Sequence, residues 1–133
     1  MNLLVINPND SDSMRAQIEA SCREVQSCRS LLEVLCAGAG VPSVEGFADG
    51  ARAQVGVLDQ ILKGEARGID GYLIACADDT GLHAARELAR GPVLGIGEAA
   101  YHTAAMLGCG FSVITAQRKS IPVLEQNLRG SGL

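Results

Sequence analysis

The stretch Gly71-Tyr72-Leu73-Ile74-Ala75-Cys76-Ala77-Asp78-Asp79-Thr80-Gly81 passes from an apolar run to a thiol, two carboxylates, a hydroxyl and a glycine. A short apolar run that ends in turn residues is typical of a buried strand in a parallel sheet. In open α/β sheets, ligands bind outside the carboxyl ends of the strands. We therefore expect the strand to deliver Cys76 to a cleft, where the positive end of the following helix favours its thiolate.

Strand and helix patterns alternate on both sides of this stretch. Apolar runs predict strands at residues 3–7, 31–36, 72–76, 93–96 and 111–115. Helical spacing of apolar residues predicts one helix face made of Met14, Ile18, Cys22 and Val25, and another made of Ala51, Val55, Leu58 and Leu62. Strands joined by crossover helices predict an α/β fold with a parallel sheet between two helical layers.

Length and charge narrow the classes of function. The chain has 133 residues, enough for one domain with its own core, and a formal net charge of −4. A mildly acidic chain without basic clusters argues against nucleic acid as a partner. No apolar segment is long enough to span a membrane, and residues 1–7 are interpreted as a strand and not as a signal peptide.

The cysteines favour a reducing compartment. There are five, an odd number, without metal-ligand spacing, so we expect a cytoplasmic protein with no disulfide framework and no bound metal. Cys22, Cys28, Cys36 and Cys109 are interpreted as small apolar side chains, and for Cys76 both simple burial and a catalytic role stay open. The two histidines, His83 and His102, are interpreted as surface or packing residues.

Polar residues gather where the predicted strands end. They are Asn7 to Asn9, Ser43 to Glu45, Cys76 to Thr80, Gly97 with Glu98, and Thr115. Because the carboxyl ends of parallel strands meet at one rim, these residues predict a pocket for a small molecule. Each group also has a structural explanation: a turn for Asn7 to Asn9, a helix start for Glu98, a helix cap for Asp79 and Thr80, and an ordinary strand position for Thr115.

Several motifs occur in a fixed order along the chain. They are Val5-Ile6-Asn7-Pro8-Asn9, Val41-Pro42-Ser43-Val44-Glu45-Gly46, Ile74 to Leu82, Ala84-Ala85-Arg86-Glu87-Leu88, Gly91 to Ala100, and Phe111-Ser112-Val113-Ile114-Thr115. In this order they resemble the hydantoin and allantoin racemases of the aspartate/glutamate racemase superfamily. The order makes the resemblance specific, although each motif alone is weak.

The resemblance implies racemisation without a cofactor. One cysteine thiolate removes the proton from the carbon next to a carbonyl, and a second thiol on the opposite face returns a proton. Cys76 matches the first catalytic cysteine of the family. Substrate contacts carried over from the resemblance are Asn9, Ser43, Val44, Asp79 and Thr115.

Two departures from the family pattern stand out. Thr80 occupies a position where relatives usually place a proline before the glycine. Family members also have two similar α/β halves, with the second catalytic cysteine late in the second half. We expect residues 1–110 to form an N-terminal α/β racemase domain and residues 111–133 to form the first strand and helix of a truncated second domain. Cys109 precedes a predicted strand, so it should lie at the opposite rim from Cys76.

The expected fold is a flavodoxin-like three-layer sandwich with a parallel four-stranded sheet in the order 2-1-3-4, plus an extra strand-helix unit. Because the fifth strand lacks partners from its own half, we expect a homo-oligomer, with swapped elements as one form. The expected function is thiol-based racemisation of 5-substituted hydantoins or allantoin, incomplete without the second catalytic cysteine. The alternatives are an inactive small-molecule-binding pseudoenzyme and a fragment of an aspartate/glutamate racemase-like enzyme. Neutral ring ureides suit the rim better than acidic amino acids, since it offers Asp78, Asp79 and Glu98 and no strand-end Lys or Arg.

Overall fold

Strand and helix alternate from Asn2 to Leu107, as the apolar pattern predicts, and the computed structural model describes every residue from Met1 to Leu133. The elements are β1 (Asn2–Asn7), α1 (Asp12–Val25), β2 (Leu31–Cys36), α2 (Phe47–Arg67), β3 (Gly71–Ile74), α3 (Leu82–Leu88), β4 (Val93–Gly95), α4 (Ile96–Leu107), the 3-10 turn η1 (Arg118–Ser120) and α5 (Ile121–Gly130). None of the helices combines the length and apolar composition needed to cross a membrane.

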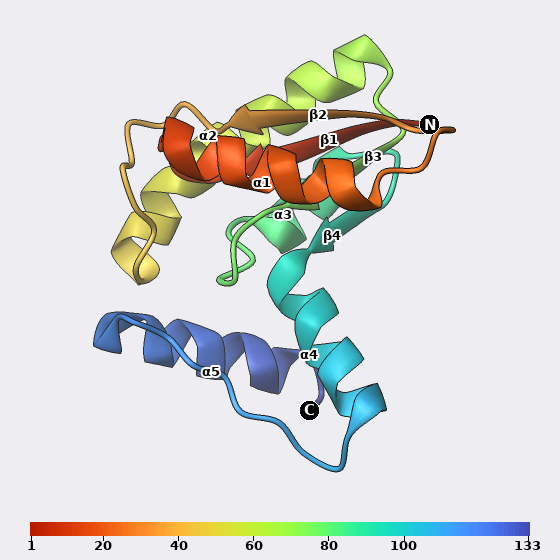
Figure 1. Cartoon of the computed structure of the whole chain (residues 1–133). Helices are drawn as coiled ribbons and strands as arrows, with labels where there is room; N and C mark the ends of the chain where they lie inside the picture. The colour runs from red at the N-terminus through yellow and green to blue at the C-terminus, as the bar shows by residue number, and fades with distance from the viewer.

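The four strands form one parallel sheet in the order β2-β1-β3-β4, which confirms the predicted order. Val5 of β1 lies opposite Val34 on one side and Leu73 on the other. The α1 helix packs against one face of the sheet, and α2 and α3 pack against the other (Figure 1). The fold is therefore a flavodoxin-like three-layer α/β sandwich, with all four strand ends at one rim.

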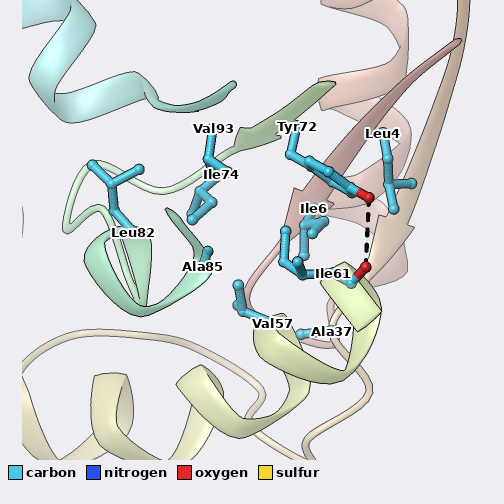
Figure 2. Packing of buried hydrophobic residues seen from close by; sticks show 10 residues of the cluster. All are labelled: Leu4, Ile6, Ala37, Val57, Ile61, Tyr72, Ile74, Leu82, Ala85 and Val93. Carbon is cyan, nitrogen blue, oxygen red and sulfur yellow. Dashed lines mark hydrogen bonds between the residues drawn. The ribbon is translucent and has the colours of Figure 1, made fainter. Parts of the chain in front are cut away.

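The hydrophobic core lies between the sheet and the layer made by α2 and α3. Figure 2 shows its side chains: Leu4, Ile6, Ala37, Val57, Ile61, Tyr72, Ile74, Leu82, Ala85 and Val93. The Tyr72 hydroxyl donates to the Ile61 carbonyl at 3.5 Å and to the Glu65 carboxylate at 2.8 Å, so the one phenol in this core is not left unpaired. Each fully buried aliphatic side chain contributes about 1.5–3 kcal/mol.

The predicted apolar face of α2 is wrong, and that of α1 is only partly buried, with Ile18 and Cys22 half-buried. On α2, Val55 and Leu62 are exposed, and the sheet-facing residues are instead Ala53, Gly56, Val57, Ile61 and Gly64. Close approach explains the difference, because a Cβ on Gly64 would lie 2.6 Å from the Tyr72 ring and one on Gly56 would lie 2.7 Å from the Ala37 carbonyl oxygen. On α1 no residue is fully buried, and Val25 is 85% exposed. This helix covers its face of the sheet alone over β1 and β2, without a second helix beside it to enclose its apolar side.

The predicted fifth strand is also wrong. Residues 111–115 form no strand, because no neighbouring strand is present to accept their backbone hydrogen bonds, and Ile114 is 95% exposed. The Phe111 ring instead stacks on Tyr101 of α4, with ring centroids 6.2 Å apart. The predicted last helix is confirmed as α5, which lies with the far part of α4 below the sheet (Figure 1). The division into domains at residue 110 stays a prediction.

Candidate active site

Cys76 lies just beyond β3, in a turn closed by a 3.0 Å hydrogen bond from the Asp79 N–H to the Cys76 carbonyl. Its side chain is half-buried and packs against the hydrophobic core. Burial raises the pKa of the Cys76 thiol, and the charges of Asp78 and Asp79 add to this. The Asp78 backbone N–H and the Thr80 hydroxyl act in the opposite direction.

The helix-supported thiolate expected from the sequence is not found. The next helix, α3, begins only at Leu82, well beyond the Cys76 turn. Desolvation outweighs the two donors near the sulfur, so the pKa of the Cys76 thiol lies above the ordinary thiol value.

Asp79 joins the Cys76 loop to α4. Its carboxylate accepts hydrogen bonds from the backbone N–H groups of Gly97 at 2.9 Å and Glu98 at 2.6 Å. These are first-turn amides that have no partner inside the helix, and the positive end of α4 favours an anion there. The sequence-based explanation that Asp79 and Thr80 cap the helix beginning near Gly81 is wrong, because α3 has no side-chain cap and the Asp79 carboxylate caps α4 instead. Burial raises the pKa of Asp79, although the two amides act to lower it.

Two local features make this contact possible. Asp79 has a left-handed backbone with φ of 48°, a conformation that Asp tolerates better than most residues. Glycine is required at Gly97, since a Cβ there would lie 2.8 Å from Asp79 Oδ2 and would also strike the Ala77 carbonyl. A Cβ on Gly95 would likewise strike the Asp79 carboxylate. The two glycines therefore let α4 approach the Cys76 loop.

Asp10, which the sequence reasoning missed, connects the ends of β1 and β2. Its carboxylate accepts from the N–H groups of Gly38 at 2.7 Å, Gly40 at 2.5 Å and Val41 at 3.1 Å. Its own N–H donates to the Val41 carbonyl at 2.9 Å. The sequence offered one signal for such an acceptor, namely the two glycines in Gly38-Ala39-Gly40. Both glycines have positive φ, and a backbone of this kind exposes amides that need an acceptor. No local pattern identifies Asp10 as that acceptor.

Asn9, Ser43 and Val44 lie on either side of the Asp10 contacts. The side-chain oxygen Oδ1 of Asn9 accepts from Asn7 Nδ2 at 2.8 Å and from the Ser11 N–H at 3.0 Å, which holds the side chain in a turn. Ser43 is exposed and Val44 is half-buried, in the loop that Asp10 holds at Val41. These three predicted residues thus belong to one connected region at the rim.

The η1 turn and α5 hold the loops on both sides of the site, contacts that sequence reasoning also missed. Asn127 Nδ2 donates to the Asp78 carbonyl at 2.7 Å. Ser120 Oγ donates to the Glu45 carbonyl at 2.7 Å, and Lys119 forms ion pairs with Glu45 at 2.9 Å and with Asp49 at 3.2 Å. Residues 119–127 therefore connect the loop of Ser43 and Val44 to the loop of Cys76.

Thr115 stands apart from the other predicted site residues. It lines an apolar cavity of about 660 Å³ together with Ile114, Ile121, Leu124 and Leu128. Neither Cys76 nor Asn9 lines this cavity. A smaller cavity of about 270 Å³ borders the Cys76 loop and is lined by residues that include Gln54, Asp78, Thr80 and Asn127. The structure thus places Thr80 and Asp79 beside Cys76, but not Thr115.

Buried polar atoms without partners cluster near the same loop. Asp78 Oδ2, Thr80 Oγ1, Tyr101 Oη and Asn7 Oδ1 are all shielded from solvent and form no hydrogen bond. Burial raises the pKa of Tyr101, and the nearby carboxylates of Asp79 and Asp78 add to the effect. Buried polar groups in folded proteins usually have a partner, so four such atoms without one inside the chain are notable.

Glu98 has a structural partner. It forms a two-point ion pair with Arg86, at 2.7 and 3.1 Å, and this pair holds the pKa of Glu98 below its usual range. Arg86 also donates to the Val93 carbonyl at 3.0 Å. Arg86, which contacts β4 at Val93, is therefore already paired with a carboxylate. No group of three or more His, Cys, Asp or Glu side chains is placed to share a metal ion.

Comparison with known proteins identifies close relatives over the whole chain. The family model described as Asp/Glu/Hydantoin racemase matches residues 3–133. A hydantoin racemase from Rhizobium meliloti is 44% identical over 125 residues, which cover 94% of this chain and 52% of that protein. A hydantoin racemase from Pseudomonas sp. (strain NS671) is 35% identical over 133 residues, covering 100% of this chain and 53% of that protein.

Solved structures agree with these matches. An allantoin racemase from Klebsiella pneumoniae superposes with a TM-score of 0.96 at 45% identity, over 99% of this chain and 54% of that one. An allantoin racemase from Pseudomonas fluorescens superposes with a TM-score of 0.93 at 32% identity, over 100% of this chain and 56% of that one. The chain spans about half the length of the curated relatives it matches. With a family model that covers nearly every residue, the chain belongs to the Asp/Glu/hydantoin racemase family.

Proposed function

We propose that this chain carries the Cys76 half of a cofactor-independent racemase site that acts on 5-substituted hydantoins or allantoin. The observation that carries the proposal is the position of Cys76. It follows a central strand of the parallel sheet, at the rim where such folds bind ligands, in a loop fixed from two sides by Asp79 and Asn127. The similarity to hydantoin and allantoin racemases supports the choice of substrate class.

The proposed chemistry is proton transfer at the carbon next to a carbonyl. When sulfur acts as the base, the C–H bond breaks, an S–H bond forms, and the electron pair moves toward the carbonyl oxygen. When sulfur acts as the acid, the same step runs in reverse. A racemase of this type needs one protonated and one deprotonated thiol at the start of each turnover. The raised pKa of Cys76 suits the protonated partner.

The second thiol is proposed to come from outside these 133 residues. Cys28 and Cys109 are exposed, and Cys22 lies on α1, far along the chain from the rim loops. Cys36 ends β2 beside Asn7, where its sulfur lies 3.7 Å from Asn7 Nδ2 and 3.8 Å from the Ser11 carbonyl. Alone, the chain is expected to exchange the substrate proton on one face without efficient inversion.

Substrate contacts are assigned to Asn9, Ser43 and Val44, which share the rim region with the Cys76 loop. Asp79 is assigned to holding the loop, because both of its oxygens accept from α4. Thr115 lines another cavity, so no contact within this chain is assigned to it. A neutral ring ureide fits a rim where the nearest arginine, Arg86, is already paired with Glu98.

The test is deuterium exchange of an enantiopure 5-substituted hydantoin or allantoin in deuterium oxide, followed by proton NMR together with chiral chromatography. The expected result is α-proton loss above the protein-free rate, with little inversion, and its loss in Cys76→Ala. Cys28→Ala is the matched control, because that thiol is exposed and remote. Equal exchange in wild type and Cys76→Ala would overturn the proposal. Inversion at the rate of full-length relatives would overturn the need for a second thiol.

Burial of Cys76 favours one other candidate, a module that binds the ureide without turnover. A thiol that stays protonated at neutral pH is a poor base unless a partner removes its proton. Calorimetric binding of allantoin that is equal in wild type and Cys76→Ala, without exchange in either, would support this candidate. We also propose a cytoplasmic location, which the five free cysteines favour.

A further inference from the structure

Thr80 is a buried hydroxyl without a partner. The residue is only 5% exposed, and its Oγ1 is shielded from solvent and forms no hydrogen bond within the chain. A threonine hydroxyl in a turn ordinarily bonds to a nearby backbone group or to water. This one has no such backbone partner within the chain, and leaving a buried hydroxyl unpaired costs free energy. Ordinary bonding within the turn therefore does not explain why a hydroxyl is buried at Thr80.

Thr80 and Cys76 lie in one short loop, which is closed by a 3.0 Å hydrogen bond from the Asp79 N–H to the Cys76 carbonyl. Asp79 before it and Gly81 after it both have positive φ, 48° and 75°, so the backbone turns sharply on each side. Asp79 is anchored to α4, and the Asp78 carbonyl is anchored to Asn127. The backbone on the N-terminal side of Thr80 is thus anchored, and the Thr80 side chain is buried in this loop.

We propose that Thr80 is a thiolate-stabilising residue of this site, whose hydroxyl donates a hydrogen bond to Cys76 Sγ whenever the sulfur carries negative charge. The inference rests on the proposed function, in which Cys76 exchanges a proton with the substrate carbon. The resemblance places a proline at this position in relatives, and proline has no hydroxyl. The proposed hydrogen bond from the Thr80 hydroxyl to the Cys76 sulfur is therefore a feature of this sequence and not of the family pattern.

The surroundings of Cys76 show why such a donor is needed. The carboxylates that face the sulfur, Asp78 and Asp79, lie on its own loop, and both disfavour the thiolate. From α5 the loop receives the neutral amide of Asn127, and from α4 it faces Tyr101, whose hydroxyl has no partner. No cation on these elements bonds to the loop. The hydroxyl of Thr80 and the N–H of Asp78 are the groups that favour the charged sulfur.

The experiment measures the ionisation of the Cys76 thiol directly. Trypsin releases residues 68–86, between Arg67 and Arg86, as a peptide in which Cys76 is the only cysteine. The folded protein is alkylated with iodoacetamide at a series of pH values, and the modified fraction of this peptide is read by mass spectrometry. Thr80→Val keeps the shape of the side chain and removes the hydroxyl, and Thr80→Ser keeps the hydroxyl.

The expected result is about tenfold less thiolate at a given pH in Thr80→Val, a shift of about one pKa unit, with Thr80→Ser close to wild type. If Thr80→Val perturbs the fold by circular dichroism, the comparison of Thr80→Ala with Thr80→Ser takes its place. Identical titration in wild type and the hydroxyl-free variants would overturn the inference. So would an effect that disappears in Asp78→Asn, since it would assign the hydroxyl to that carboxylate.

The outcome is separable from that of the proposed function. A shifted titration without proton exchange in any variant would retain the role of Thr80 toward sulfur and reject the racemase chemistry. Proton exchange that depends on Cys76, together with a thiol titration that does not depend on the Thr80 hydroxyl, would retain the racemase chemistry and reject the role of Thr80.

Discussion

The carboxylate of Asp79 accepts a hydrogen bond from the backbone N–H of Glu98 at 2.6 Å and thereby fastens the loop after β3 to the first turn of α4. The neighbouring Gly97 N–H adds a second bond at 2.9 Å. Helix starts carry unpaired amides and partial positive charge, and a carboxylate satisfies both. The loop that bears Cys76 and the junction of β4 with α4 therefore behave as one unit.

Substitution at Gly97 tests this unit. In Gly97→Ala the added Cβ would lie 2.8 Å from Asp79 Oδ2 and would strike the Ala77 carbonyl, so the loop and the helix must separate. We expect a loss of about 2–3 kcal/mol in the free energy of unfolding, measured with urea. Gly50→Ala in α2 is the control: its Cβ meets nothing within 4 Å, and it should stabilise the helix by about 0.5–1 kcal/mol. Equal effects at the two positions would contradict the close approach.

Asp10 is expected to control the order of the loop that carries Ser43 and Val44. Asp10→Ala removes the acceptor for three backbone N–H groups and should cost about 2–3 kcal/mol. Hydrogen exchange should quicken most at the amides of Gly38, Gly40 and Val41. The matched control is Asp12→Ala, because that side chain is 94% exposed and its ion pair with Arg15, at 3.6 Å, contributes little. Unchanged exchange in Asp10→Ala would show that the loop is held by other contacts.

The succession of strand and helix patterns along the sequence was enough to predict most of the fold. Alternating apolar runs and helical segments predicted a parallel sheet between two helical layers, because crossover helices join parallel strands. The rim position of Cys76 followed from the same rule. The strand order β2-β1-β3-β4, which the structure confirms, was predicted only together with the family resemblance. The predicted strand at residues 111–115 failed because a strand needs a neighbour, and an apolar pattern does not supply one.

Contacts between distant segments explain the remaining differences. The buried face of α2 was misassigned because Gly56 and Gly64 allow a closer approach than Val55 and Leu62 do, an effect that hydrophobicity alone does not predict. The local sequence shows Asp10 and Asp79 only as polar residues in turns, so it does not predict their roles. The hydrogen-bond partners of Asp10 lie 28 or more residues away, and those of Asp79 lie 18 or more residues away. These partners can be identified only once the strands are placed side by side.

Stability should depend on pH through Asp78. Burial and the charge of Asp79 raise the pKa of Asp78, so the native state binds this proton more tightly than the unfolded chain does. Its contribution to stability is fully present below the unfolded value, about pH 4, and is lost as pH rises through the native value. Glu98, whose pKa is lowered by Arg86, contributes in the opposite direction, so the two carboxyl groups must be separated by mutation.

Asp78→Asn isolates the contribution of this carboxyl group. The difference in unfolding free energy between variant and wild type should move in favour of the variant as the pH rises from about 4 to neutrality, as measured by urea titration at each pH. Asp59→Asn on the outer part of α2 serves as the control, since that residue is exposed. A difference that stays constant with pH would mean that the Asp78 carboxyl titrates as it does in the unfolded chain.

Residues 106–114 should drive self-association. Met106 is 79% exposed, Leu107 83% and Ile114 95%, and the backbone of residues 111–115 has no sheet partner. An exposed apolar segment with unpaired backbone groups invites pairing with a second copy, so we expect a dimer by gel filtration with light scattering. Ile114→Glu should shift the population toward monomer by placing a charge in the contact. Gln117→Glu adds the same charge at an exposed polar position nearby and should not. A monomer at high concentration in the wild type would contradict the expectation, and a dimer unaffected by Ile114→Glu would place the contact elsewhere on the surface.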